Sequence, residues 1–192
     1  PQDDESHFQA LVTRGIRYVE LRSLDINPFN PNGLELTQMY FLEIFMHYCL
    51  LKSSPNIDAK EAQNIQHNNN KVALEGRDPL LVIKRNNKDI NMQQWALHIL
   101  QEMQVIAEQL DKANDTLRYS RSLAHHKAML IDPGLTPSAR ILDEMQKHGE
   151  SFTEFCMRKA VQYHQHYQSN ELSDGRSSYY KSLSRKSHRL HQ

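Results

Sequence analysis

A single strand-like run, IRYVELRS at residues 16–23, stands out in a chain whose pattern is otherwise mostly helical. Its residues alternate between two faces, Tyr18, Glu20 and Arg22 against Val19, Leu21 and Ser23. A period of two is typical of a strand with one polar and one apolar face. Because a lone strand leaves both of its edges unpaired, the run predicts a sheet whose other strands lie elsewhere.

The start of the chain supports the same expectation. PQDDESHFQ contains no Met, and it has neither the basic nor the apolar region of a signal peptide. Together with the unpaired strand, this start predicts that the 192 residues belong to a longer protein. We expect the missing strands to precede residue 1.

Helices are predicted over most of the remaining chain. LDINPFNPNG at residues 24–33 has two Asn-Pro steps and a Gly, which favour a structured loop. The predicted helices cover residues 5–14, Leu36 to about 51, 59–75 behind an Asp58 cap, 91–112, 115–130, 137–148 and 151–168. A hairpin is predicted at residues 79–91, with its turn near Asn86–Asn87.

The first long apolar helix and the C-terminal end of the chain carry further expectations. The helix that begins at Leu36 is apolar nearly all round, which is typical of a buried helix. Residues 171–192 are basic and rich in Ser, and their composition predicts a mobile, solvated tail. The chain is therefore divided into residues 1–170 and this tail.

Charge and cysteine content limit the classes of partner. Lys and Arg number 23, as do Asp and Glu, so no net charge is available to attract nucleic acid or acidic membranes. The longest apolar run, residues 39–51, is interrupted by Glu43 and His47 and is too short to cross a bilayer. Two Cys are too few for a disulfide framework, which favours a reduced, cytoplasmic compartment.

Glu20 and Arg22 are the charged pair with the clearest chemical meaning. Two residues apart on a strand, they lie about 7 Å apart and point the same way. A carboxylate can bind Mg²⁺, and a guanidinium can hold phosphate oxygens, so the pair suits phosphoryl transfer. The same spacing also fits an ordinary ion pair on a solvated strand face. Spacing alone leaves both interpretations open.

Glu43 and His47 are a second candidate pair, one helical turn apart. Two ligands are too few for a metal site, so a hydrogen-bonded pair at the edge of the core is the favoured interpretation.

Four segments in order resemble one known family: RGIRYVELRSLDINPFNPNG, FLEIFMHYCLL, NNNKVALEGRDP and LTPSARIL. They resemble the glutamate–cysteine ligases, also called γ-glutamylcysteine synthetases, of the proteobacterial type. The resemblance extends from about residue 8 to residue 168 and matches the C-terminal third of these longer enzymes. It implies an α+β fold, in which a mostly helical segment contributes one or a few strands to a glutamine-synthetase-like antiparallel sheet funnel.

The resemblance also implies an activity and two site residues. The family joins the side-chain carboxyl of L-glutamate to the amine of L-cysteine, with ATP and Mg²⁺, through an acyl phosphate in the first step of glutathione biosynthesis. By the family's motif, Glu20 would bind the metal, and Arg22 would be catalytic and lie against the ATP phosphates. Residues 1–170 would be an incomplete part of the catalytic domain, inactive alone.

Two alternatives remain beside this interpretation. Another carboxylate–amine ligase of the glutamine-synthetase-like superfamily would use the same ATP chemistry with a different amine acceptor. A helical interaction module would account for the helices and the basic tail, but it gives no reason for the Glu20 and Arg22 face.

Overall fold

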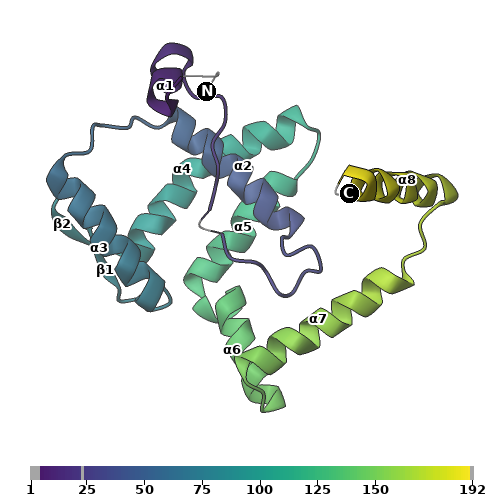
Figure 1. Cartoon of the computed structure of the whole chain (residues 1–192). Helices are drawn as coiled ribbons and strands as arrows, with labels where there is room; N and C mark the ends of the chain where they lie inside the picture. Colours follow the sequence, from purple (N-terminus) through teal and green to yellow (C-terminus); the bar gives the residue numbers. More distant parts are fainter. Residues whose placement is uncertain (1–4, 23, 191–192) are drawn as a thin grey trace.

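The computed structural model describes residues 5–22 and 24–190 of the chain (Figure 1). Within these residues the protein is mostly helical and has one two-stranded antiparallel sheet. The elements in chain order are α1 (His7–Arg14), α2 (Leu36–Leu51), α3 (Ala59–Glu75), β1 (Val82–Arg85), β2 (Lys88–Asn91), α4 (Met92–Ala113), α5 (Arg118–Ile131), the 3₁₀-helix η1 (Pro133–Leu135), α6 (Pro137–His148), α7 (Phe152–Ser169) and α8 (Asp174–Leu190). These bounds confirm the helices and the hairpin predicted before residue 170.

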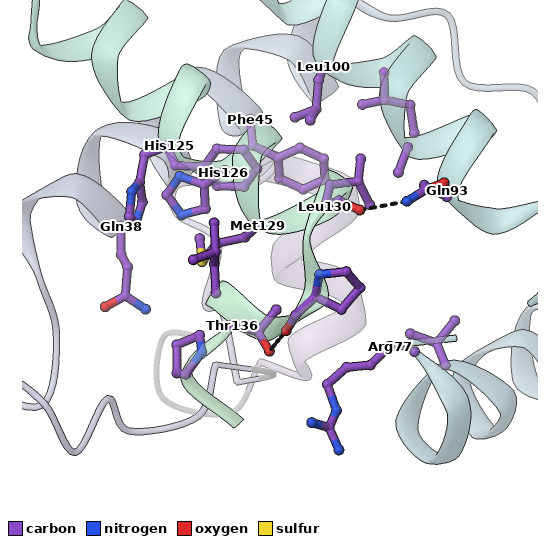
Figure 2. A pocket seen from close by; sticks show the side chains of 18 of the residues that line it. Gln38, Phe45, Arg77, Gln93, Leu100, His125, His126, Met129, Leu130 and Thr136 are labelled. Carbon is purple, nitrogen blue, oxygen red and sulfur yellow. Dashed lines mark hydrogen bonds between the residues drawn. The ribbon is translucent and has the colours of Figure 1, made fainter. Parts of the chain in front are cut away.

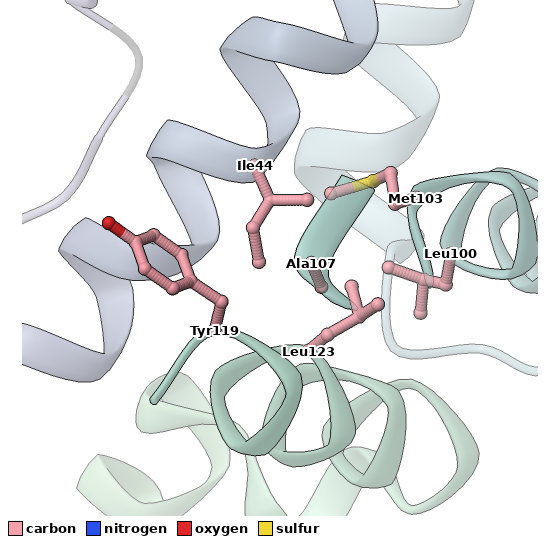
Figure 3. Close-up of a cluster of buried hydrophobic side chains, with 6 residues drawn as sticks. All are labelled: Ile44, Leu100, Met103, Ala107, Tyr119 and Leu123. Atoms are coloured by element: carbon pink, nitrogen blue, oxygen red, sulfur yellow. The ribbon is translucent and has the colours of Figure 1, made fainter. Parts of the chain in front are cut away.

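The core forms where α2, α4 and α5 pack together (Figure 3). Its buried side chains are Ile44, Leu100, Met103, Ala107, Tyr119 and Leu123. On α4 the buried residues Leu100, Met103 and Ala107 recur three and four positions apart, which places them on one helical face. Burial of each large apolar side chain contributes about 1.5–3 kcal/mol. The contact of these three helices is therefore a main source of stability.

Asparagine side chains fix α3 to the hairpin. Asn68 Nδ2 donates to the Lys84 carbonyl oxygen (2.6 Å), and the Lys84 N–H donates back to Asn68 Oδ1 (2.8 Å). Asn64 Nδ2 also donates to Asn87 Oδ1 (2.9 Å) in the turn. Asn86 and Asn87 have φ values of 50° and 61°, as a tight two-residue hairpin turn requires. The predicted turn is confirmed, and the run of Asn in α3 gains a structural role.

The strand predicted at residues 16–23 is not formed. Residues 16–22 have no regular secondary structure, and Ser23 lies outside the described residues. A strand is defined by hydrogen bonds to a neighbour, and the only described strands, β1 and β2, pair with each other. No described segment supplies the partner that the alternating pattern needs, so the pairing of these residues with strands elsewhere stays a prediction.

α2 is also less buried than its composition predicts. Only Ile44 is buried in this helix, whereas Leu36, Met39, Leu50 and Leu51 are exposed. One face of α2 packs on α4 and α5, and nothing in residues 5–22 or 24–190 covers these four side chains. The apolar sequence thus reflects a surface that this chain leaves open.

The C-terminal segment forms a helix rather than an irregular tail. In Figure 1, α8 lies beyond the far end of α7, and none of its residues is buried. The mobility expected for residues 171–192 stays a prediction. Residues 191–192, and residues 1–4 at the other end of the predicted 1–170 part, lie outside the described residues.

Asp111 at the end of α4 holds the first turn of α5 in place. It is only 5% exposed; its Oδ1 accepts the N–H of Tyr119 and its Oδ2 the N–H of Ser120, both at 2.9 Å. Leu117, which precedes α5, has no side chain that can cap the helix, so Asp111 supplies the acceptors. Burial raises the pKa of Asp111, but the hydrogen bonds from Ser120 and Tyr119 outweigh burial and leave the pKa lowered.

We expect Asp111→Asn to destabilise the fold by about 1–2 kcal/mol, because the amide NH₂ would face the Ser120 N–H without an acceptor. Asp143→Asn is the control, since Asp143 is exposed and makes no hydrogen bond within the described residues. Denaturant unfolding at several pH values measures the difference. Because the pKa of Asp111 is lower in the folded protein than in the unfolded chain, its ionised carboxylate stabilises the fold at pH values above the ordinary Asp pKa. This stabilisation is lost as the pH falls through the pKa of the folded state. A difference that persists unchanged at low pH would contradict the assignment.

Candidate functional site

Glu20 and Arg22 lie together on the exposed segment that precedes the Asn-Pro loop. Arg22 Nη2 donates to Glu20 Oε2 at 2.9 Å, and the side chains of Arg22 and Glu20 are 82% and 58% exposed. The structure thus places the two predicted site residues next to each other, within reach of a ligand. Their predicted roles, metal binding for Glu20 and phosphate binding for Arg22, stay predictions.

Further metal ligands are not gathered around this pair. In the part of the chain that the structure describes, no group of three or more His, Cys, Asp or Glu side chains could hold a metal ion. One carboxylate nevertheless fits Mg²⁺, which keeps waters and substrate phosphate oxygens as most of its ligands. Glu20 would therefore be one protein ligand of a larger set.

Glu43 and His47 do not form the side-chain pair expected from the sequence. Glu43 Oε2 accepts the hydroxyl of Tyr119 (2.9 Å), while His47 Nδ1 lies 2.8 Å from the backbone oxygen of Glu43. The carbonyl one turn earlier is the nearer partner for the imidazole, so the carboxylate is left to Tyr119. That prediction is wrong.

A cavity of about 660 Å³ opens beside the Glu20–Arg22 segment (Figure 2). Its apolar wall comes from α2, α4 and α5, including Phe41, Phe45, Leu100, Met129 and Leu130. Its size is that of a small-molecule pocket.

None of the helices within the described residues is long and apolar enough to cross a membrane.

Polar side chains lie around the apolar wall of this cavity. Figure 2 shows His125, His126 and Gln38 on one side of the view and Arg77 on the other. The His126 ring stacks on Phe41 with 4.0 Å between centroids, and its Nδ1 lies 2.8 Å from the Ser122 carbonyl oxygen. Burial lowers the pKa of His126, so its ring is neutral at neutral pH.

All four sequence segments that carry the family resemblance contribute to the cavity. The first supplies Leu21 and Leu24, the second Phe41 and Phe45, the third Arg77, and the fourth Thr136 and Arg140. Sequence reasoning did not assign Arg77 or Arg140 to a site, and only their positions inside these segments pointed to them. Their convergence is a property of the fold and could not be read from spacing.

We expect Glu20→Gln and Arg22→Lys to leave the stability of this chain unchanged within about 0.5 kcal/mol, because exposed ion pairs contribute little. Thermal unfolding of the chain measures this. A clear fall in Tm for either variant would indicate that the pair is structural.

A sequence model of the glutamate–cysteine ligase family matches residues 1–72, which include Glu20 and Arg22. The glutamate–cysteine ligase of Pseudomonas savastanoi pv. phaseolicola is 39% identical over 169 residues, covering 88% of this chain and 32% of that protein. The glutamate–cysteine ligase of a Janthinobacterium species (strain Marseille) is 35% identical over 185 residues, covering 95% and 35%.

A solved structure shows the same similarity in three dimensions. The crystal structure of glutamate–cysteine ligase from Francisella tularensis in complex with AMP matches 93% of this chain and 35% of that one, with a TM-score of 0.80 and 26% identity. The chain thus spans about a third of the length of the curated relatives that it matches.

Proposed function

Because this chain is a relative of the glutamate–cysteine ligases and matches about a third of their length, we propose that it supplies the C-terminal part of such an enzyme. The reaction joins the side-chain carboxyl of L-glutamate to the amine of L-cysteine, at the expense of ATP, in the cytoplasm. The observation that carries the proposal is the match of almost the whole chain to these ligases, one of them solved with AMP. The exposed Glu20–Arg22 pair supports it.

The chemistry needs ATP because a carboxylate is a poor acyl donor. An oxygen of the glutamate side chain attacks the terminal phosphorus of ATP, a new O–P bond forms, and ADP leaves. The cysteine nitrogen then attacks the acyl carbon, phosphate leaves, and the nitrogen loses a proton. Phosphoryl transfer of this kind depends mainly on positioning and on neutralisation of charge.

Glu20 and Arg22 provide the two kinds of group that this step needs. The Arg22 guanidinium can donate two parallel hydrogen bonds to phosphate oxygens, where a Lys would act as a point charge. The Glu20 carboxylate offers hard oxygen ligands to Mg²⁺, which when bound neutralises phosphate charge. Their mutual hydrogen bond in this chain keeps both groups on the same side of the segment.

The rest of the site would come from residues that precede this chain in its relatives. We propose that strands there pair with residues 16–23 to complete an antiparallel sheet funnel, with α2 to α7 outside it. The open faces of this segment and of α2 would then be covered. The free thiols of Cys49 and Cys156 are compatible with a reduced compartment.

We expect the isolated chain to make no γ-glutamylcysteine from ATP, L-glutamate and L-cysteine, because its described residues hold one candidate metal ligand and no sheet around that ligand. A coupled assay for ADP with product analysis measures this. Turnover above the enzyme-free rate would contradict the incomplete-site proposal.

In a full-length ligase that carries this chain, Arg22→Lys should lower kcat by about 10²-fold, because an oriented donor to transition-state charge is lost. Glu20→Gln should lower kcat and also raise the Mg²⁺ concentration that gives half-maximal rate. Steady-state kinetics at varied Mg²⁺ separate the two effects.

Two neighbouring residues serve as charge-matched controls. Arg17→Lys and Asp25→Asn make the same changes at exposed sites that have no hydrogen bond or ion pair within the described residues. If the Glu20 and Arg22 variants match these controls, the pair has no catalytic role.

A product formed with another amine in place of cysteine would indicate a related ligase.

A further inference from the structure

The loop that follows the Glu20–Arg22 segment is held by α7, a helix more than a hundred residues later in the chain. Tyr163 Oη donates to the carbonyl oxygen of Pro28 at 2.6 Å, and Tyr167 Oη donates to Asn32 Oδ1 at 2.7 Å. Both acceptors belong to the loop of residues 27–33. Tyr163 is half-buried, so its hydrogen bond is protected from water more than the exposed Tyr167 contact is.

An aromatic contact fixes the same loop from the side. Phe29 packs edge-on against Phe155 of α7, with ring centroids 6.2 Å apart, and Phe155 is fully buried. The Arg140 guanidinium lies 3.9 Å from the centre of the Phe29 ring, and the Lys159 ammonium lies 4.9 Å from it. Such contacts fix the position of a ring as well as its burial.

Ion pairs brace the helices that make these contacts. Arg158 of α7 pairs with Glu144 of α6 at 3.0 Å and also with Glu150, and Lys159 pairs with Glu144 at 3.0 Å. Burial raises the pKa of Glu144, but hydrogen bonds from Arg158 and Lys159 outweigh it and leave the pKa lowered. Glu144 therefore stays ionised at neutral pH. Its ion pairs with Arg158 and Lys159 hold α6 and α7 together beside the loop.

The other end of the loop is attached to α2. Asn27 Nδ2 donates to Glu35 Oε1 and Gln38 Oε1, both at 3.1 Å, and the Asn27 N–H donates to the Gly33 carbonyl at 2.8 Å. Gly33 has φ +73°, and a Cβ there would lie 3.0 Å from the Ile26 side chain, so a larger residue would open the turn. The loop is a closed unit seated between α2 and α7.

We propose that Tyr163 is a positioning residue for Arg22, acting through the loop of residues 27–33. This inference rests on the proposed ligase function. Among the described residues, Glu20 and Arg22 form hydrogen bonds only with each other, and Leu21 between them lines the cavity, so the segment is held by Leu21 and by the chain on either side. Arg22 precedes Asn27 by only five residues, so on this proposal a shift of the loop moves the guanidinium. Misplacement by about 1 Å can cost a large factor in rate.

The first test measures the coupling itself in a full-length ligase that carries this chain. Tyr163→Phe removes only the hydroxyl, and we expect amide hydrogen exchange in residues 16–33 to rise about fivefold, as loss of one hydrogen bond predicts. Exchange in α4 and α5 should not change. Tyr179→Phe is the matched control, because this exposed tyrosine lies in α8, away from the loop.

The second test is a double-mutant cycle on kcat. If Tyr163 acts through Arg22, Tyr163→Phe should lower kcat about fivefold in the wild type and have little further effect in Arg22→Lys. KM for L-cysteine should stay unchanged, since the segment is not proposed to bind that substrate. A merely structural tyrosine would instead give the same factor in both backgrounds, which would overturn the proposal.

The two tests separate failure of this proposal from failure of the proposed function. Unchanged exchange in residues 16–33 would overturn the coupling, whatever the enzyme does. An enzyme without ligase activity, or with an Arg22→Lys variant as active as wild type, would overturn the proposed function. A rise in exchange confined to residues 27–33, with residues 16–22 unaffected, would also overturn the role of Tyr163, because the loop would then move without moving the segment.

Discussion

The buried side chain of Asn27 joins the part of this chain that carries the candidate chemistry to the part that carries its stability. The residue is 4% exposed; its amide donates to Glu35 and Gln38 at the start of α2, and its Oδ1 accepts the N–H of Phe29 at 3.0 Å. An unpaired amide at this depth would cost about 1–3 kcal/mol, so the loop and the helix start must form together. These hydrogen bonds fix the position of the loop relative to α2. They therefore also fix the point at which residues 16–22 join the helical part.

This arrangement divides the molecule into a helical body and an exposed candidate segment. The body is stabilised by the packing of α2, α4 and α5, and none of its buried core residues belongs to the candidate pair. The pair itself is exposed and contributes little to stability. Residues that bind ligands must stay accessible and keep donor or acceptor atoms free for the ligand. Such residues contribute little to a core.

Local sequence signals predicted the elements well because the physics of helix ends and tight turns is local. Asp58 accepts the N–H of Glu61 at the start of α3, and Asn86 and Asn87 adopt the positive φ values of a hairpin turn. Local signals were not enough where partners decide the outcome: residues 16–22 have no neighbouring strand among the described residues, and Glu43 bonds Tyr119 rather than the His47 side chain. Nothing in the sequence indicated that Tyr163 would reach Pro28, or that four distant segments would line one cavity.

The most direct test of the account is a crystal structure of a full-length ligase carrying this chain, with Mg²⁺ and an ATP analogue bound. We expect a Glu20 oxygen about 2.1 Å from Mg²⁺ and the Arg22 guanidinium within hydrogen-bonding distance, about 3 Å, of a phosphate oxygen. Residues 16–23 should be a paired strand, and Pro28 should still accept the hydrogen bond of Tyr163. A structure in which Glu20 and Arg22 remain paired with each other, facing solvent away from the nucleotide, would contradict the account.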